Sequence, residues 1–357
     1  MKKEVVILGA GISGLTAAIN LRLEGYDVII YEIHKDVGTR FKGDLQGLEN
    51  WSNKKEIVDE LKDMNIKLNF DHNPFSKVYM SETSITSSTT WKRPFFYLVK
   101  RGSFNGTLDY GLKKQALKLG VKIEFNKTIN KNKADIIAIG PDPKKTFAID
   151  KGIIFKTKRK NKAVLVLNDK LGYQGYSYLL IDNHYGCLCS VSFGNIKKIN
   201  KCFEEAKKFF EKKYNLNIQN PKKVGGIGNF AISRKKIKTN KNPKQLYVGE
   251  AGGFQDLLLG FGMRFAFESG YLAARSIIEK KDYQKLIKKK IEKRLKAGIV
   301  DRYIFEKFKK LVYFGLVAHP KLTKWLLYPV YNYTIFHRMI YSFARKRLMK
   351  KYPNLEL

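Results

Sequence analysis

Six residues near the start of the chain, Gly9-Ala10-Gly11-Ile12-Ser13-Gly14, have the types and spacing that bind the phosphates of a dinucleotide. Gly9 permits a tight turn, Gly11 lets the backbone approach a pyrophosphate, and Gly14 allows a helix to pack closely on a strand. The helix that follows offers free N–H groups and a positive dipole end to phosphate oxygens, and Ile12 and Ser13 of the motif are also candidate cofactor-binding residues.

A carboxylate follows this motif at the spacing that a ribose requires. Glu32 comes eighteen residues after Gly14, where it can accept hydrogen bonds from both ribose hydroxyls. A negative charge there disfavours a 2′-phosphate. The motif therefore predicts FAD or NAD rather than NADP, and the alternative is a similar turn that binds no nucleotide.

The elements around the motif have the order that it needs. Residues 5–8 read as a buried strand, residues 15–23 carry a helical apolar pattern, and residues 28–31 read as a second buried strand ending at Glu32. Strand, glycine turn, helix, strand and terminal acid together predict a βαβ unit with a bound nucleotide.

A second glycine-rich block, residues 245–263, repeats the pattern of strand, turn and helix. Glu250 could hold a sugar hydroxyl, and Gly260 and Gly262 let the backbone pass close to a flat ring. The helix that begins near Met263 would place a positive dipole end beside that ring, which would stabilise an anionic reduced flavin. Since no second GxGxxG follows a strand, we expect no resident nicotinamide.

Residues between these blocks alternate between helical and strand patterns. We expect a cofactor loop over 37–47, with Arg40 near the phosphates or adenine, and helices over 54–65 and 108–119. Strands at 78–80 and 95–99, separated by a Ser/Thr-rich segment, predict a hairpin. Further strands are expected at 121–125 and 134–140. From 153 to 193 the pattern is rich in strands, and a helix is expected over 201–214.

These elements predict an α/β fold, α+β overall: a Rossmann-like cofactor domain with an inserted antiparallel-sheet domain and a C-terminal helical region. We assign residues 1–75, 100–150 and 225–280 to the cofactor domain. Residues 76–99 and 151–224 are assigned to the substrate-binding sheet, and residues 281–357 to the helical region. Residues 225–228 are expected to be a turn or a strand end.

The formal net charge of +37 predicts either a solvated basic surface or attraction to an anionic membrane face or nucleic acid. The three cysteines, Cys187, Cys189 and Cys202, are odd in number and include no CxxC, so we expect buried thiols, no metal site and a reduced cytoplasmic protein. No secretion signal is expected, because the apolar run after Lys2-Lys3 is the glycine motif itself.

The C-terminal helical region mixes basic and aromatic residues and is interrupted near Pro320 and Pro329. Residues 325–336 are uncharged but too few to span a bilayer. This composition suits the headgroup boundary of an anionic membrane. The alternatives are a helical cap on the core, a dimer contact, or nucleic-acid binding, for which no motif is present, so we expect no nucleic-acid partner.

Residues 1–280 resemble FAD-dependent oxidoreductases of the geranylgeranyl reductase family, part of the larger group with the aromatic-hydroxylase fold. The resemblance rests on GAGISGLTAA with Glu32, RGSFNGTL at 101–108, ADIIAIG at 134–140 and the block GEAGGFQDLLLGFGMRFAFESGYLAA. It implies FAD as the cofactor. The residues implied to hold it are Gly9, Gly11, Gly14, Glu32, Arg40, Arg101 and Glu250, with the flavin ring near Gly260 and Gly262.

The chain departs from this family at four places. Glu250 stands where the group usually has Asp, Asn105 replaces an acid after Arg101, and Lys42 lies where a cysteine is common. The family's Tyr-x-Trp-x-Phe-Pro segment is approximated by residues 176–181, in which Tyr176 and Tyr178 are candidates for lining a substrate tunnel. The alternative for both tyrosines is a place in the core.

The function that the resemblance implies is reduction of a C=C bond in an isoprenoid or other lipid, by hydride transfer from reduced flavin and protonation of the other carbon. Electrons would come from a transient NAD(P)H or a small redox protein. No catalytic acid is identified. A monooxygenase or halogenase of the same fold, and a non-catalytic membrane-associated flavoprotein, are the alternatives. We expect a cytoplasmic protein at a membrane surface.

Overall fold

The computed structural model describes residues 3–230, 245–318, 332–353, 355 and 357, except the side chain of residue 314. The glycine motif lies in a five-stranded sheet in which every pair is parallel, in the order β15-β9-β1-β2-β8. Its strands are β1 (Glu4–Leu8), β2 (Asp27–Tyr31), β8 (Lys122–Glu124), β9 (Ile136–Ile137) and β15 (Leu246–Tyr247). This arrangement confirms the predicted Rossmann-like unit.

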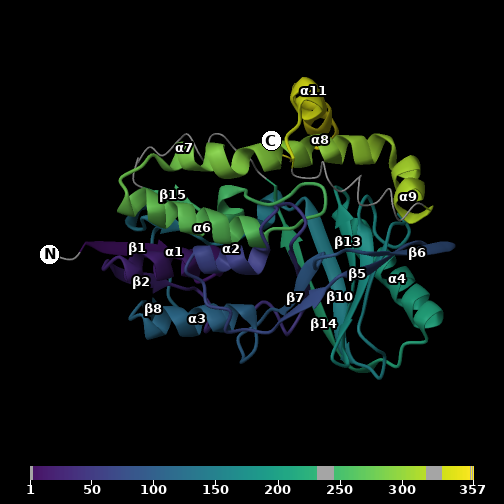
Figure 1. Ribbon diagram of the computed structural model, residues 1–357, viewed down its shortest axis with the longest axis horizontal. Helices are drawn as coiled ribbons and strands as arrows, with labels where there is room; N and C mark the ends of the chain where they lie inside the picture. The colour runs from purple at the N-terminus through teal and green to yellow at the C-terminus, as the bar shows by residue number, and fades with distance from the viewer. Residues whose placement is uncertain (1–2, 231–244, 319–331, 354, 356) are drawn as a thin grey trace.

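A layer of helices packs against this sheet. The sequence patterns predicted most of them within a few residues. They are α1 (Ile12–Leu23), α2 (Ile57–Asp63), α3 (Leu108–Lys118) and α6 (Met263–Ile278). Every residue of α1 from Ile12 to Leu21 is buried, because α1 packs on the sheet between α6 and α3. Figure 1 shows α6, α1 and α3 one below the other along the sheet.

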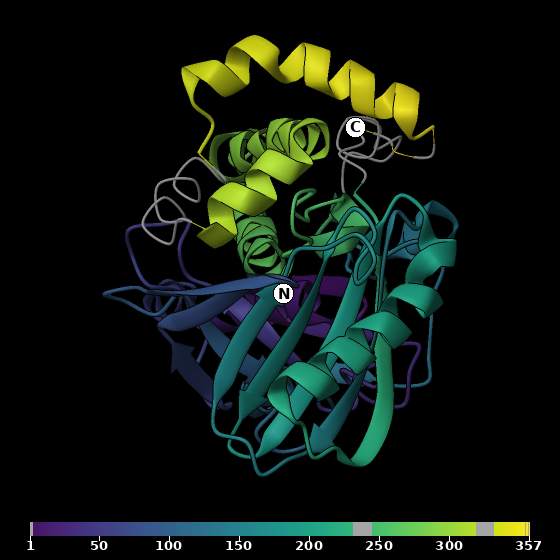
Figure 2. The same ribbon diagram turned by 90° about the vertical axis from the view of Figure 1, so that its right-hand side faces the viewer.

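A second sheet of seven strands stands beside the first, in the order β14-β10-β13-β12-β11-β5-β6. All its pairs are antiparallel except β11 with β5. Its strands are β5 (Lys77–Glu82), β6 (Ile85–Thr90), β10 (Ala148–Lys156), β11 (Lys162–Val166), β12 (Tyr176–Asp182), β13 (Tyr185–Phe193) and β14 (Gln219–Gly228). The helix α4 (Ile199–Tyr214) covers one face through Phe203, Ala206 and Phe210 (Figure 2).

One predicted hairpin is wrong. The Ser/Thr-rich segment expected to be its turn is strand β6, which pairs with β5. The strand β7 (Phe96–Lys100) instead lies in a three-stranded sheet between β3 (Leu45–Glu49) and β4 (His72–Phe75). Because β3 begins at Leu45, the loop predicted over 37–47 is also shorter than expected. Residues 225–228 form the end of β14, as one of the two predicted alternatives.

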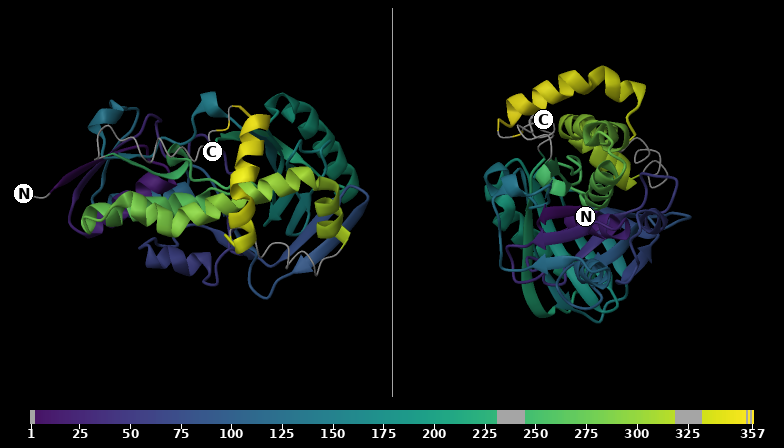
Figure 3. Two further views of the ribbon diagram at one scale, coloured as in Figure 1. Left: turned by 90° about the horizontal axis from the view of Figure 1, so that it is seen from above. Right: turned by 90° about the vertical axis from the view of Figure 1, so that its left-hand side faces the viewer.

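The C-terminal helices form a layer above both sheets. The helix α7 (Tyr283–Ile287) continues through a π-helical turn, η5 (Lys288–Glu292), into α8 (Lys293–Lys307) and is followed by α9 (Lys309–Ala318). The helix α11 (Ile335–Lys351) crosses over α8 (Figure 3). The breaks predicted near Pro320 and Pro329 lie outside the described residues. Among the described helices, none is long and apolar enough to cross a membrane.

Candidate functional site

The two glycine-rich blocks meet at one edge of the parallel sheet. β1 and β15 flank β9, so their carboxyl ends lie at the same edge, where Gly9 follows β1 directly and Gly249 comes two residues after β15. A Cβ at Gly249 would lie 2.7 Å from Ser13 Oγ, and one at Gly270 in α6 would clash with the backbone of Ser13. Glycine at both positions therefore brings the second block and α6 into direct contact with the start of α1.

A cavity of about 1470 Å³ opens at this edge and extends between the seven-stranded sheet and the C-terminal helices. We call it the central cavity. It exceeds the volume typical of a pocket for one small ligand. Eleven of the twelve predicted cofactor residues line it: Gly9, Gly11, Ile12, Ser13, Glu32, Arg40, Arg101, Glu250, Gly260, Gly262 and Met263. Gly14 does not line it.

The glycines of the first motif have the geometry that their spacing predicts. Gly9 has φ +106°, and a Cβ there would clash with the carbonyl of Ala138 in the strand connection beside it. A Cβ at Gly14 would clash with the carbonyl of Gly9, so Gly14 serves the packing of α1 on the turn. A Cβ added at Gly11 would lie 4.0 Å from the carbonyl oxygen of Ala138, the nearest atom given for it, which leaves space for a ligand to reach the backbone on that side.

Two helices begin at the central cavity without a side-chain cap. The N-cap residues are Gly11 for α1 and Gly262 for α6, and neither can supply a side-chain hydrogen bond. The first N–H groups of a helix have no intrahelical partner. Both helix starts therefore present unpaired donors and a positive dipole end, which suits an anionic group at each place.

Glu32 is buried at the end of β2 and is held by the motif itself. Its Oε2 accepts a hydrogen bond from the Ala10 N–H at 2.7 Å, and its Oε1 accepts one from the His34 N–H at 3.0 Å. Each carboxylate oxygen can accept a further hydrogen bond. Glu32 therefore keeps the capacity to bind hydroxyl groups of a ligand in the cavity.

Arg40 and Glu250 come from opposite ends of the chain and face each other. Arg40 Nη2 lies 3.7 Å from Glu250 Oε2, and the guanidinium also lies over the ring of Phe41. Burial raises the pKa of Glu250, while Arg40 and Arg101 lower it. The pair places one positive and one negative group in the wall of the central cavity.

Arg101 has a structural partner that the sequence did not reveal. Its guanidinium donates from Nε and Nη2 to the two carboxylate oxygens of Asp109, each at 2.8 Å, and from Nη1 to Gln46 Oε1 at 3.1 Å. Asp109 lies in the first turn of α3 and also accepts from the Gly102 N–H. Arg101 lines the cavity, but two of its hydrogen bonds connect the end of β7 to α3 through Asp109.

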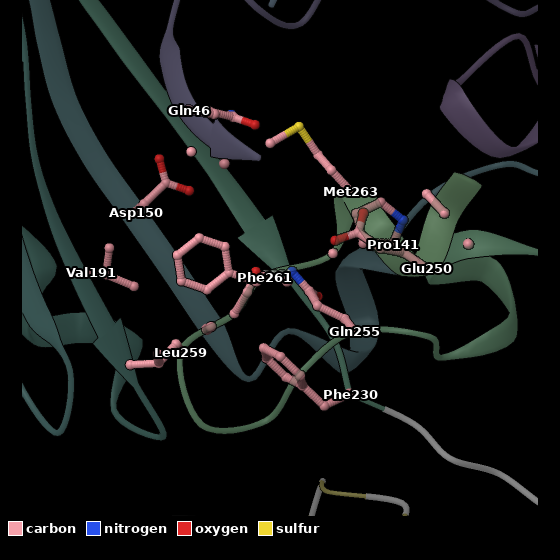
Figure 4. A pocket seen from close by; sticks show the side chains of 18 of the residues that line it. Gln46, Pro141, Asp150, Val191, Phe230, Glu250, Gln255, Leu259, Phe261 and Met263 are labelled. Carbon is pink, nitrogen blue, oxygen red and sulfur yellow. Dashed lines mark hydrogen bonds between the residues drawn. The ribbon is translucent and has the colours of Figure 1, made fainter. Parts of the chain in front are cut away.

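The second block supplies a polar atom with no partner. Gln255 donates from Nε2 to the carbonyl of Gly260 at 2.9 Å, whereas its buried Oε1 has no hydrogen-bond partner in the described part of the chain. Gln255 lines the central cavity beside Phe261 and Met263 (Figure 4). A ligand with an N–H donor could satisfy this oxygen, as the pyrimidine edge of a flavin would.

The remote part of the cavity is apolar. Tyr176 and Tyr178 line it from β12, and the Tyr176 hydroxyl donates to the carbonyl of Leu259 at 2.6 Å. Burial raises the pKa of both tyrosines, so both hydroxyls stay protonated. Sequence patterns did not predict the opposite wall, which comes from α8 and α9. It includes Ile304, Phe305, Phe308, Leu311, Val312 and Leu316.

The cysteines do not form a reactive centre. Cys187, Cys189 and Cys202 are free and buried, as predicted, and the sulfur atoms of the first two lie 3.7 Å apart. The Cys187 thiol and burial raise the pKa of Cys189, which keeps it protonated and poorly reactive. Within the described ranges, no group of three or more His, Cys, Asp or Glu residues could hold a metal ion.

Comparisons with known proteins agree with this geometry. The model of the NAD(P)-binding Rossmann-like domain family matches residues 7–45, which include the glycine motif and Glu32. No curated protein matches the chain by sequence.

Three solved structures illustrate the fold similarity. A geranylgeranyl bacteriochlorophyll reductase-like protein from Thermoplasma acidophilum has a TM-score of 0.68 and 15% identity, covering 99% of this chain and 98% of its own. A flavin-dependent brominase has a TM-score of 0.64 and 14% identity, with 98% and 100% covered. A variant of 2-methyl-3-hydroxypyridine-5-carboxylic acid oxygenase has a TM-score of 0.57 and 14% identity, with 87% and 93% covered.

At these identities the similarity shows the fold alone. The chain has the aromatic-hydroxylase-like fold of FAD-dependent oxidoreductases, which reductases, oxygenases and halogenases share. The first of these similarities also extends over the C-terminal helices, beyond the residues on which the sequence resemblance rests.

Proposed function

We propose that the central cavity binds FAD. Four features of the described residues fit this cofactor: the space beside Gly11, the two uncapped helix starts, the carboxylate of Glu32 and the unpartnered Oε1 of Gln255. Phosphates, ribose hydroxyls and a ring with an N–H donor are the groups that these features would bind. When bound and reduced, FAD would supply a hydride at N5 of its ring.

The proposed reaction is reduction of a C=C bond in an isoprenoid or related lipid. The single observation that carries this choice is the apolar extension of the cavity beyond the second glycine block, between the seven-stranded sheet and α8 and α9. Met80, Leu165 and Leu180 line one wall, and Phe305 and Val312 line the other. A long apolar cavity favours a hydrocarbon chain and excludes water from the reacting carbons.

The C-terminal helices also suggest where such a substrate would come from. Phe308 at the end of α8, Leu311 on α9 and Phe336 on α11 line the cavity and are exposed to solvent. Ile335 and Met339 continue this apolar surface. The helix α11 contains no acidic residue. An anionic membrane surface would match both the apolar and the basic side chains, and it would deliver a lipid at the cavity mouth.

The experiment that tests the reaction begins with the absorption spectrum of the purified full chain, which should show bound flavin. Anaerobic reduction with dithionite, followed by geranylgeraniol in detergent as the probe, should reoxidise the flavin. Mass spectrometry should then find a product heavier by two hydrogens per reduced bond.

A pair of variants on α9 tests the role of the apolar extension. Val312→Trp should fill the cavity and abolish reduction of the probe while flavin content is retained, whereas Lys310→Trp, on the exposed side of the same helix, should act like the unsubstituted chain. Rapid NADPH-dependent oxygen consumption stimulated by an aromatic compound, without reduced lipid, would contradict the reductase proposal and favour a monooxygenase. Bound flavin that no donor reduces would favour the non-catalytic alternative.

A further inference from the structure

One carboxyl group stands apart on the wall that the seven-stranded sheet presents to the central cavity. Asp150 lies in β10, between Val191 of β13 and Gly226 of β14 in the strand register. Among the cavity-lining residues that the described strands of this sheet contribute, it is the only carboxylate; its neighbours there include Val78, Met80, Ala148, Ala163, Leu165, Leu180 and Val191. A lone acid on an apolar wall requires an explanation, because burying a charge is unfavourable.

The surrounding backbone leaves room for this side chain. A Cβ at Gly226 would lie 2.9 Å from Asp150 Oδ1, so a larger residue in β14 would displace the carboxyl group. Figure 4 shows Asp150 entering the cavity from the sheet, while Phe261 and Met263 enter it from the second glycine block. Asp150 thus lies between the proposed ring site and the apolar extension.

The groups around Asp150 raise its pKa on balance. Burial and the negative charge of Asp44 raise the pKa of Asp150 to about 6, while Arg40 and backbone N–H groups lower it. Asp44 is itself buried, and burial raises its pKa too. The remaining titratable groups that face Asp150 are Tyr176 and Tyr178 on β12 and Cys189 on β13, and all three are neutral.

Other acids that line the cavity are less suited to give up a proton. Glu250 faces Arg40, Glu32 accepts two backbone hydrogen bonds, and Asp301 is paired with His337 on the helical side. The Tyr176 hydroxyl is bonded to the carbonyl of Leu259. Asp150 combines a place beside the proposed ring site with a pKa closer to neutral pH than that of an ordinary carboxyl group, as a general acid requires.

We propose that Asp150 is the general acid that protonates the substrate carbon which does not receive the hydride. This step rests on the function proposed above. The π bond breaks and two C–H bonds form, one with the proton of the Asp150 carboxyl group and one with the hydride. The alkene gains two electrons, the reduced flavin loses two, and the Asp150 carboxylate recovers its proton from water.

The ionisation of Asp150 can be measured without any flavin. Infrared spectra of the full chain and of Asp150→Asn, taken across a pH series, should differ by one carboxyl band that titrates with a midpoint near 6. Asp44→Asn should lower this midpoint and Arg40→Gln should raise it, because the first removes a negative neighbour and the second a positive one. A midpoint near the ordinary value of about 4, or one insensitive to Asp44→Asn, would overturn the proposal.

The catalytic role is tested with the same variants. Asp150→Asn keeps the shape of the side chain and should slow reduction of geranylgeraniol by at least about a hundredfold, with flavin content and reduction by dithionite unchanged. Asp150→Glu should restore part of the rate. If the unsubstituted chain reduces the probe and Asp150→Asn is equally fast, this inference fails alone. If the unsubstituted chain binds no flavin, the proposed function fails and the titration still reports on Asp150.

Discussion

Gly9 is the residue whose backbone depends most on the absence of a side chain. Its φ of +106° is strained for other residues, and a Cβ would also clash with the backbone of Ala138. Gly9→Ala should therefore lower the free energy of unfolding by about 2 to 4 kcal/mol, from left-handed strain and overpacking together. Urea unfolding followed by circular dichroism measures this, and flavin content should fall in parallel.

Gly25→Ala is the matched control for this substitution. Gly25 also has a positive φ, +82°, but nothing lies within 4 Å of its Cβ position, so only the backbone strain of about 1 kcal/mol should remain. Equal losses for the two variants would show that the contact with Ala138 contributes nothing. The comparison thus separates conformational strain from the close approach that the cofactor turn requires.

Asp150 should also lower the stability of the chain at neutral pH. Its pKa is about 6 in the folded state and about 4 when unfolded, so between these values the folded state binds more protons and stability falls as pH rises. Well above pH 6, as at pH 7.5, nearly the full penalty of about 3 kcal/mol is present. Asp150→Asn should remove it, giving a more stable protein at pH 7.5 and little change at pH 4.

Urea unfolding at the two pH values measures this difference. Asp63→Asn, which replaces an exposed surface carboxylate, should change stability by no more than about 0.5 kcal/mol. If Asp150→Asn is destabilising at pH 7.5, the carboxylate must be favourably bound rather than poised to accept a proton. Such a trade between stability and activity is common where a charged group serves chemistry.

Sequence reasoning could identify the residues whose roles are local. The roles of Gly9, Gly14 and Glu32 follow from spacing within one βαβ unit, and the structure has the geometry that this spacing requires. The setting of Asp150 depends instead on Asp44, which lies far away in the chain, and on its strand neighbours. The pairing of Arg101 with Asp109 likewise depends on how β7 meets α3, which no motif records.

At the scale of elements, periodic patterns predicted helices and buried strands well and failed at a sheet edge. The strand β6 is an edge strand that pairs with β5 alone, and all but one of its residues are at least partly exposed, which suits polar side chains. Its threonines and isoleucine nevertheless favour an extended backbone. Because strands were predicted from apolar residues, this polar strand was mistaken for a turn.

The contact of α11 with α8 depends on one buried histidine. His337 Nε2 donates to Asp301 Oδ1 at 3.0 Å, and His337 Nδ1 lies 2.7 Å from Thr334 Oγ1, which caps α11. Burial raises the pKa of Asp301, and the hydrogen bond from His337 lowers it. His337→Ala should leave this buried carboxylate without its partner and weaken the attachment of α11 by about 1 to 3 kcal/mol.

Amide hydrogen exchange measures this local effect. Exchange in α11 should become about tenfold faster or more, while exchange in α1 stays unchanged. Arg338→Ala, at the adjacent exposed position, should leave both rates as they are. Unchanged exchange in α11 of His337→Ala would show that the apolar contacts of Ala344 and Leu348 alone hold this helix.

At the scale of the whole molecule, the net charge and the exposed apolar face would contribute differently to membrane binding. A net charge of +37 attracts the chain to any anionic surface but does not select one face. The apolar face of α11 does, because Ile335 and Met339 are 78% and 77% exposed beside the mouth of the cavity. We therefore expect oriented binding that needs both the basic and the apolar side chains.

This expectation can be tested by sedimentation with vesicles of phosphatidylcholine and phosphatidylglycerol. The double variant Ile335→Ser and Met339→Ser should weaken binding by about 2 kcal/mol, or ~30-fold, because each side chain would leave the hydrocarbon boundary. The control double variant Ile85→Ser and Ile196→Ser removes exposed apolar residues away from α11 and should bind normally. Added salt should weaken the binding of all three proteins to the anionic vesicles. Equal losses for both double variants, or equal binding to neutral vesicles, would mean that α11 does not orient the chain, and the lipid would have to reach the cavity from solution.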